Sequence, residues 1–278
     1  MKIGIAFANT MANVQPEVAV EMAQAAEAYG FDSLWTVEHI VVPVGYESPY
    51  PYNRRGRMDY GDDADIPDPF VWLAYVAART ARITLATGVT VVPLRRPAIL
   101  AKQGATLQLM SGGRFVLGIG SGWLEEEFAA LDVSFDDRGA RTDDAIGAVR
   151  ALWEQDVASY DGEFYRFENV YCRPRPPSPI PIVVGGHSLR AARRAGELGD
   201  GFFPGRVIGG ELERLLDRMR RSAEAAGRDP DAIEVSLGAR PDPAAIEQRF
   251  AAGADRVIVP ALIGVDGLEI LGRALGIA

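Results

Sequence analysis

The chain has 278 residues, with 29 basic and 38 acidic side chains and a formal net charge of −9. This acidity argues against nucleic acids and anionic membranes, which bind basic surfaces, and leaves small molecules as the expected partners. The one cysteine, Cys172, excludes an intrachain disulfide and a zinc site built from several thiolates. The N-terminal apolar run is too short for a signal peptide, and no stretch approaches the roughly 20 apolar residues of a membrane helix. We therefore expect a cytoplasmic protein.

Short β-branched runs alternate with longer segments of helical periodicity along the whole chain. The predicted strands cover residues 2–7, 33–37, 83–92, 114–119, 182–184, 201–203, 234–237 and 256–259. The predicted helices cover residues 16–29, 70–79, 98–110, 141–153, 189–198, 211–226, 244–252 and 268–275. This strict alternation predicts a parallel sheet of the α/β class. Eight strand–helix units in this length favour a closed (β/α)8 TIM barrel, with residues 1–278 forming a single domain.

Two connections lack either periodicity. Residues 41–69 form a long loop after the second strand, and a stretch of this length inside a compact domain is typically functional or disordered, so it is a candidate lid. Residues 160–181 form a second, proline-rich connection. The first loop holds several aspartates, but their spacing is not that of a calcium loop, so we expect no metal site. These aspartates are Asp59, Asp62, Asp63, Asp65 and Asp68.

The second predicted strand ends in Glu38-His39. Barrel enzymes place their active sites at the C-terminal ends of the strands and in the loops that follow. The imidazole of His39 is suited to acid–base catalysis near neutral pH, and the neighbouring carboxylate of Glu38 can bias its protonation. A histidine at the rim of a barrel can equally be a structural residue that bonds to the backbone. His187 is the only other histidine in the sequence.

Glycines mark the third and fourth predicted strands. Gly88 interrupts the third, where it permits either simple packing or the close approach of a flat ring. The fourth runs into Gly120-Ser121-Gly122-Trp123, whose spacing is not that of a dinucleotide-binding fingerprint. These glycines form either a tight turn or a surface that a ligand can approach closely.

The fifth predicted strand ends in Gly185-Gly186-His187-Ser188, directly before a helix. Two glycines at this position expose backbone N–H groups at the positive end of the helix dipole, and a serine hydroxyl can add to them. The pattern suits a phosphate, although a helix capped by serine explains it equally well.

Taken together and in order, these segments resemble the luciferase-like monooxygenase superfamily, and within it the oxidoreductases that depend on the deazaflavin coenzyme F420. The resemblance spans nearly the whole chain. The matching motifs are Phe31-Asp32-Ser33-Leu34-Trp35 before Glu38-His39, Pro93-Leu94-Arg95-Arg96-Pro97, Leu100-Ala101-Lys102-Gln103, Ser111-Gly112-Gly113-Arg114, Gly118-Ile119-Gly120-Ser121-Gly122-Trp123 with Glu127-Phe128, and Gly185-Gly186 ahead of Gly199-Asp200-Gly201-Phe202.

The resemblance implies where a cofactor lies. A redox ring occupies the C-terminal mouth of the barrel, supported by a non-prolyl cis peptide bond that maps onto Gly88 and Val89. The phosphate cradle of the family maps onto the segment from Gly185 to Ser188. His39 matches the histidine beside the reactive ring face, with Glu38 where many members carry an acid. The cofactor-binding residues expected on this basis are Gly88, Val89, Gly120, Ser121, Gly122, Gly185, Gly186, His187 and Ser188.

The resemblance also implies an activity, namely hydride transfer between coenzyme F420 and a small organic substrate in a homodimer. Three alternatives stay open: a monooxygenase that uses reduced FMN and oxygen, a barrel that binds a flavin-like ligand without turnover, and an unrelated barrel enzyme with a phosphorylated substrate. In the sugar-phosphate dehydrogenase branch, an acid stands where this chain has Trp123. A lysine follows the sixth strand there, where this chain has Pro204-Gly205-Arg206. A sugar phosphate is therefore not the expected substrate.

Overall fold

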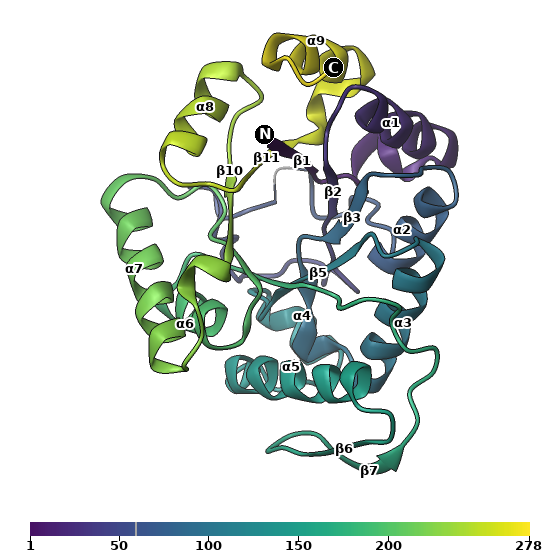
Figure 1. Cartoon of the computed structure of the whole chain (residues 1–278), viewed down its shortest axis with the longest axis vertical. Helices are drawn as coiled ribbons and strands as arrows, with labels where there is room; N and C mark the ends of the chain where they lie inside the picture. Colours follow the sequence, from purple (N-terminus) through teal and green to yellow (C-terminus); the bar gives the residue numbers. More distant parts are fainter. Residues whose placement is uncertain (59) are drawn as a thin grey trace.

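The computed structural model describes residues 1–58 and 60–278, and within these ranges nine parallel strands form one sheet. The strands are β1 (Lys2–Ala6), β2 (Ser33–Thr36), β3 (Thr84–Thr87), β4 (Thr90–Val91), β5 (Phe115–Gly120), β8 (Ile182–Gly185), β9 (Gly201–Phe203), β10 (Glu234–Gly238) and β11 (Arg256–Pro260). Both β3 and β4 pair with β5, and β1 pairs with β2 and β11. The sheet therefore closes on itself, which confirms the predicted barrel (Figure 1).

Helices surround the strands on all sides (Figure 1). They are α1 (Pro16–Ala28), α2 (Pro69–Ala77), α3 (Pro97–Met110), α5 (Arg138–Glu154), α6 (Leu189–Leu198), α7 (Gly209–Ala225), α8 (Pro243–Ala251) and α9 (Gly264–Leu275). Several begin at a capping side chain, as where Asp68 accepts hydrogen bonds from the N–H groups of Phe70 and Val71. No helix within the described ranges has both the length and the apolar character needed to cross a bilayer.

Successive strand residues face opposite sides of the barrel wall, which gives the molecule two apolar layers. Outward-facing residues such as Ile5 and Leu85 pack with helix residues such as Leu73 and Met219 in the main core. Complete burial of a side chain of this size contributes about 1.5–3 kcal/mol to stability. The smaller interior cluster is centred on Trp35, which packs with other buried apolar side chains inside the barrel.

The structure differs from the predicted elements in three places. The strand predicted over residues 83–92 is not continuous, because the peptide bond between Gly88 and Val89 is cis and the pairing divides into β3 and β4. The connection over residues 160–181 is not irregular throughout, since β6 (Ala158–Asp161) and β7 (Arg166–Val170) form an antiparallel hairpin beside α5 (Figure 1). A short helix that periodicity did not reveal, α4 (Glu125–Ala130), follows β5.

The N-terminal ends of the strands meet in a group of paired charges, the floor cluster, made by Lys2, Asp32, Glu234 and Arg256. The Arg256 side chain is only 8% exposed. Its Nε lies 2.9 Å from Asp32 Oδ2, and its Nη1 lies 2.5 Å from Glu234 Oε1. Glu234 also accepts a hydrogen bond from Lys2 Nζ at 2.7 Å. Burial raises the pKa of Asp32 in spite of the neighbouring Arg256 guanidinium. The floor cluster closes the barrel below Trp35.

Candidate active site

The predicted site residues lie together at the opposite, C-terminal end of the barrel. Parallel pairing aligns Thr36 at the end of β2 with Thr87 at the end of β3, and aligns Ile119 of β5 with Val184 of β8. The residues that follow these strands are therefore brought to one face. They are Glu38, His39, Gly88, Val89, Gly120, Ser121, Gly122, Gly185, Gly186, His187 and Ser188.

Val89 forms an apolar platform at this mouth. A Cβ atom on Gly120 would lie 2.6 Å from Val89 Cγ2, and one on Gly185 would lie 2.5 Å from Val89 Cγ1. Both distances are far below van der Waals contact, so the two glycines are required by the position of the valine. The Gly88–Val89 bond is cis, as the family resemblance implied. The mouth therefore presents a flat, glycine-bounded surface that suits a planar ring.

His39 is held by a carboxylate that the sequence did not point to. Its Nδ1 lies 2.8 Å from Oε2 of Glu127, which is the third residue of α4 and is 2% exposed. The other carboxylate oxygen accepts hydrogen bonds from the backbone N–H groups of Ile40 at 2.6 Å and Val41 at 3.3 Å. Glu127 thus fixes both the imidazole and the chain that leaves it. The family motif includes Glu127, but 88 residues separate it from His39 and no spacing pattern connects the two.

The contact with Glu127 decides what the imidazole can do. A carboxylate only accepts hydrogen bonds, so Nδ1 of His39 carries the proton and donates it. In neutral histidine the remaining nitrogen, Nε2, then has a free lone pair that can accept a proton. The same arrangement stabilises the imidazolium that results. The His39–Glu127 pair is therefore built for reversible proton transfer at Nε2.

Glu38 has a different environment from the predicted one. The sequence suggests that it biases His39, but its Oε2 accepts a hydrogen bond from Val91 N–H at 2.7 Å and its Oε1 accepts one from Arg95 Nε at 2.7 Å. Arg95 in turn bonds to Asp68 Oδ2 at 2.7 Å, so the network joins β2, β4 and the start of α2. Burial raises the pKa of Glu38, although Arg95 opposes the shift. Glu38 is thus linked to β4, which begins directly after Val89.

The loop between β2 and α2, as described over residues 37–58 and 60–68, extends across the mouth. Asn9 joins its two ends, since its Nδ2 donates to the carbonyl oxygens of Val37 at 2.9 Å and Pro67 at 3.0 Å. At the other side of the mouth, the ring of Tyr52 lies 5.4 Å from that of His187, between centroids. Of the loop aspartates, Asp59 lies outside the described residues, and the part of the loop that is described contributes to no cluster of metal-ligating side chains.

Aromatic side chains hold this loop against α4. Trp123 makes edge-to-face contacts with His39, Tyr46 and Tyr50, with ring centroids 5.2–5.7 Å apart. Glu126 accepts hydrogen bonds from the N–H groups of Glu47 at 2.6 Å and Ser48 at 3.0 Å. Although burial acts in the other direction, these bonds and the Ser48 hydroxyl lower the pKa of Glu126 to about 2. Aromatic contacts and hydrogen bonds to the Glu126 carboxylate together hold the described part of the loop in place.

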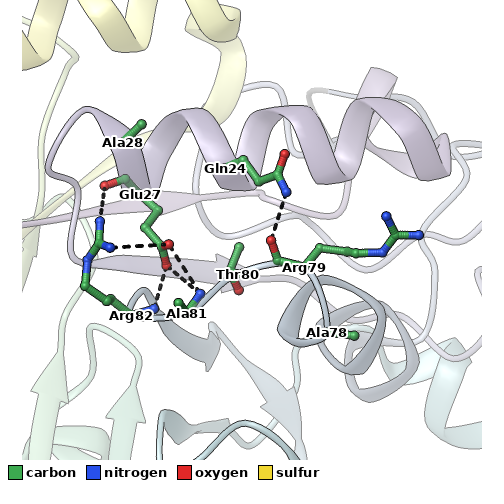
Figure 2. Close-up of a pocket in the computed structure, with 8 residues that line it drawn as sticks. All are labelled: Gln24, Glu27, Ala28, Ala78, Arg79, Thr80, Ala81 and Arg82. Carbon is green, nitrogen blue, oxygen red and sulfur yellow. Dashed lines mark hydrogen bonds and ion pairs between the residues drawn. The ribbon is translucent and has the colours of Figure 1, made fainter.

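A pocket at the opposite end of the barrel is of a different kind (Figure 2). It lies between the end of α1 and the turn after α2, and Glu27 is its central carboxylate. Glu27 accepts hydrogen bonds from the backbone N–H groups of Ala81, Arg82 and Ile83, which lower its pKa despite burial. Both oxygens of its carboxylate therefore bind the backbone of the turn that leads into β3, which holds that turn in its conformation. We therefore assign this pocket a structural role.

With the site described, the chain can be compared with known proteins. The profile of the luciferase-like monooxygenase family matches residues 1–260. The chain belongs to this family. Among its luciferase-like relatives, an F420-dependent glucose-6-phosphate dehydrogenase of Gordonia bronchialis is 33% identical over 254 residues, covering 87% of this chain and 70% of the relative.

Solved structures of luciferase-like proteins share the fold. An F420-dependent secondary alcohol dehydrogenase in complex with an F420–acetone adduct superposes with a TM-score of 0.81 at 21% identity, over 99% of this chain and 98% of that one. The monooxygenase RslO1 from Streptomyces bottropensis gives a TM-score of 0.68 at 28% identity, over 91% and 76% of the two chains.

Proposed function

We propose that this protein is a coenzyme F420-dependent oxidoreductase that transfers a hydride between the deazaflavin and a small organic substrate. The observation that carries the proposal is the His39–Glu127 pair, which leaves Nε2 available at the mouth of a luciferase-like barrel. The sequence similarity to F420-dependent dehydrogenases supports the choice of cofactor.

The mouth fits a flat ring with an anionic tail. Val89, with Gly120 and Gly185 beneath its methyl groups, would support one ring face. Gly186, whose φ is +122°, and the start of α6 would receive the phosphate. The Ser188 hydroxyl oxygen already accepts a hydrogen bond from Ala191 N–H at 3.1 Å. It would therefore bind the phosphate by donating its own proton. When bound, the deazaflavin supplies or accepts the hydride.

The residues of the chain manage the proton that accompanies the hydride. In the oxidative direction, a substrate C–H bond gives up its hydride and an adjacent O–H gives its proton to Nε2 of His39, so that a carbonyl forms. Glu127 stabilises the imidazolium through Nδ1. The aromatic loop excludes water from the mouth. Glu38 acts in this scheme by positioning β4 through Val91.

The substrate we propose is uncharged. The position where sugar-phosphate dehydrogenases carry an acid holds Trp123, which contacts His39 and the loop tyrosines. The nearest buried charges at the mouth, Glu38 with Arg95 and Glu127 with His39, already bind one another. An apolar or aromatic alcohol, or the corresponding carbonyl compound, is the class that such a wall favours.

The test is a pair of variants measured for both binding and turnover. His39→Ala should lower kcat about 100- to 10,000-fold and leave the Kd for F420 unchanged, because the imidazole handles the proton. His187→Ala, at the cradle, should raise the Kd and preserve kcat at saturating cofactor. Turnover of His39→Ala at the wild-type rate would refute the proposed role.

A second candidate function is an FMN-dependent monooxygenase, which the similarity to RslO1 favours. Parallel titrations with oxidised F420 and with FMN separate the two, since each ring changes its absorbance or fluorescence when bound. Tight binding of FMN alone, with oxygen consumption by the reduced complex, would replace the first proposal. Binding of either cofactor without oxidation of any acceptor would instead indicate a silent binding barrel.

We further infer that the chain is a homodimer built on α2 and α3. These neighbouring helices expose apolar side chains along one surface, namely Val71, Tyr75, Ile99, Leu109 and Met110. An exposed apolar patch of this kind is typical of an interface. Light scattering should report a dimer for the wild type and a monomer for a Val71→Glu, Ile99→Glu variant. Ile270→Glu, on the exposed face of α9, is the control that should remain dimeric.

The proposed setting is the cytoplasm, with residues 1–278 acting as one catalytic domain. The buried free thiol of Cys172 is compatible with a reducing compartment. Fractionation of cells that express the protein, and a single cooperative unfolding transition, would test these two statements.

A further inference from the structure

Two arginines at the rim of the mouth, Arg138 and Arg190, form no ion pair within residues 1–58 and 60–278. Arg138 is the first residue of α5 and Arg190 is the second of α6, so both stand where helices begin at the C-terminal face. The two helices are joined at this end, since Arg194 Nη2 donates to Gly139 O at 2.9 Å. Arg190 precedes Arg194 by one helical turn and therefore lies on the same side of α6, toward Arg138.

The other arginines on this side of α6 are neutralised. Arg194 Nε and Arg193 Nη2 both bind the carboxylate of Asp143, the latter at 2.7 Å. Arg193 also pairs with Glu197 one turn later. In the described part of the chain, neither Arg138 nor Arg190 forms an ion pair. These two guanidinium groups thus keep their positive charge in a protein whose net charge is −9.

Arg138 is held in place by Phe135, three residues earlier in the chain. Its Nη1 donates to Phe135 O at 2.9 Å, and its guanidinium lies 3.7 Å from the centroid of the Phe135 ring. Burial, and then the charge of Arg190, lower the pKa of Arg138, while the charges of Asp136 and Glu125 act in the other direction. Two like charges brought together on a fixed scaffold favour an anion between them.

The pair stands beside the two glycine turns of the site. The Oγ1 of Thr142, one turn after Arg138, donates to the carbonyl oxygen of Arg138 at 2.7 Å and accepts a hydrogen bond from the Ser121 hydroxyl at 3.0 Å, which ties α5 to the turn after β5. Arg190 follows the Gly185–Ser188 segment by two residues. A ligand that left the mouth between β5 and β8 would therefore pass these two guanidinium groups.

We propose that Arg138 and Arg190 form a clamp for the polyanionic tail of the cofactor, outside the phosphate position at the start of α6. The inference rests on the proposed function. The tail of F420 continues beyond its phosphodiester into glutamate carboxylates, and guanidinium groups bind both kinds of anion in bidentate fashion. FMN ends at a single phosphate and does not extend to such a clamp. The two arginines are therefore the feature of this chain that selects the deazaflavin coenzyme.

The experiment is an equilibrium titration, followed by deazaflavin fluorescence, with two ligands. One is intact F420, and the other is its deazaflavin core with the ribityl chain but without phosphate and glutamates. For F420, Arg138→Ala and Arg190→Ala should each raise the Kd about tenfold, which is typical of one lost charge-assisted contact. The tail-free core should bind wild type and variants equally.

Arg220→Ala is the matched control, because it removes the same charge from an exposed position late in α7, far from the mouth. It should leave both Kd values unchanged. Raising the salt concentration should weaken binding of F420 to the wild type more than to the double variant.

The outcomes are distinct. If the wild type binds F420 but the arginine variants bind it equally well, the clamp is refuted and the proposed function survives. The clamp is also refuted if the variants lose affinity for the tail-free core to the same extent, since the arginines would then act on the ring site. If the wild type binds neither deazaflavin, both the clamp and the F420-dependent function fail.

Discussion

The two ends of the barrel use charge in opposite ways. At the N-terminal end, Arg256 binds Asp32 and Glu234, and Glu27 is occupied by three backbone N–H groups. At the C-terminal end, no hydrogen bond within the described residues occupies Nε2 of His39, and the two arginines of the proposed clamp form no ion pair there. Groups whose hydrogen bonds and ion pairs are all formed within the fold contribute to stability. Groups that can still form a hydrogen bond or an ion pair are available to a ligand. The following variants test this division.

The largest expected effect is at the floor cluster. Arg256→Met should lower the free energy of unfolding by about 3 kcal/mol, because it leaves Asp32 and Glu234 without their buried partner. Lys2→Met, which breaks a pair whose lysine side chain is 55% exposed, should cost less than about 1 kcal/mol. Urea unfolding measures both. A large loss of cofactor affinity in Arg256→Met at temperatures where it is folded would contradict the division between the two ends.

The platform at the mouth offers the next test. Gly120→Ala should destabilise the protein by about 1–3 kcal/mol, since the new methyl group would lie 2.6 Å from Val89 Cγ2. Adding Val89→Ala should recover part of the lost stability and still weaken cofactor binding. Gly210→Ala, on α7 with open space around it, is the neutral control. If Gly120→Ala were as stable as Gly210→Ala, the valine would not occupy the space between the glycines.

Glu127→Gln tests the carboxylate that holds His39 in the proposed proton transfer. The amide would present a donor to Nδ1 of His39 and so favour the tautomer whose proton is on Nε2. Turnover in the direction that needs a base should fall about 10- to 100-fold, as is typical when the partner of a functional histidine is replaced. The acidic limb of the pH profile for kcat, where the base becomes protonated, should move as well, which a purely structural loss would not produce. An unchanged pH profile would indicate that Glu127 acts only by binding the backbone N–H groups of Ile40 and Val41, and has no effect on the protonation of His39.

The smallest expected effect concerns the loop fastening. The pKa of Glu126 is lowered from 4.5 to about 2, so its ionised form stabilises the folded state fully above pH 4.5. That contribution is lost as the pH falls from 4.5 through 2, where the carboxylate takes up a proton. The difference in unfolding free energy between wild type and Glu126→Gln should therefore be constant near neutral pH and shrink in acid. A difference that grew on acidification would contradict this assignment.

The barrel was predictable because its periodicities are local. Strands such as β11 (Arg256–Pro260) and helices such as α6 show their burial pattern within a few residues. The division of the third strand was not predictable from periodicity, because a cis bond at Gly88 leaves the β-branched run unchanged. The β6–β7 hairpin was missed because its residues are mostly exposed or half-buried, so they show no apolar alternation.

The site was predictable in position and only partly in partners. Strand ends placed His39 and the glycines at one mouth through topology alone. The partner of His39 was not predictable, because Glu127 lies on a helix of six residues, too short for a periodic signal. Adjacency in sequence suggested Glu38 instead, whose carboxylate binds Val91 and Arg95 in the structure. Contacts between distant segments depend on where loops cross in space, which spacing along the chain does not encode.

The position of Trp123 has a practical consequence. Of the four tryptophans in the sequence, Trp35, Trp72 and Trp153 are buried at 1%, 5% and 6% exposure, and Trp123 alone stands between the imidazole and the loop tyrosines. Its emission should therefore respond to any change in the packing of the loop tyrosines against it, while the other three give a steadier background. The protein carries an intrinsic optical reporter of this loop contact, readable in a stopped-flow instrument without any attached dye.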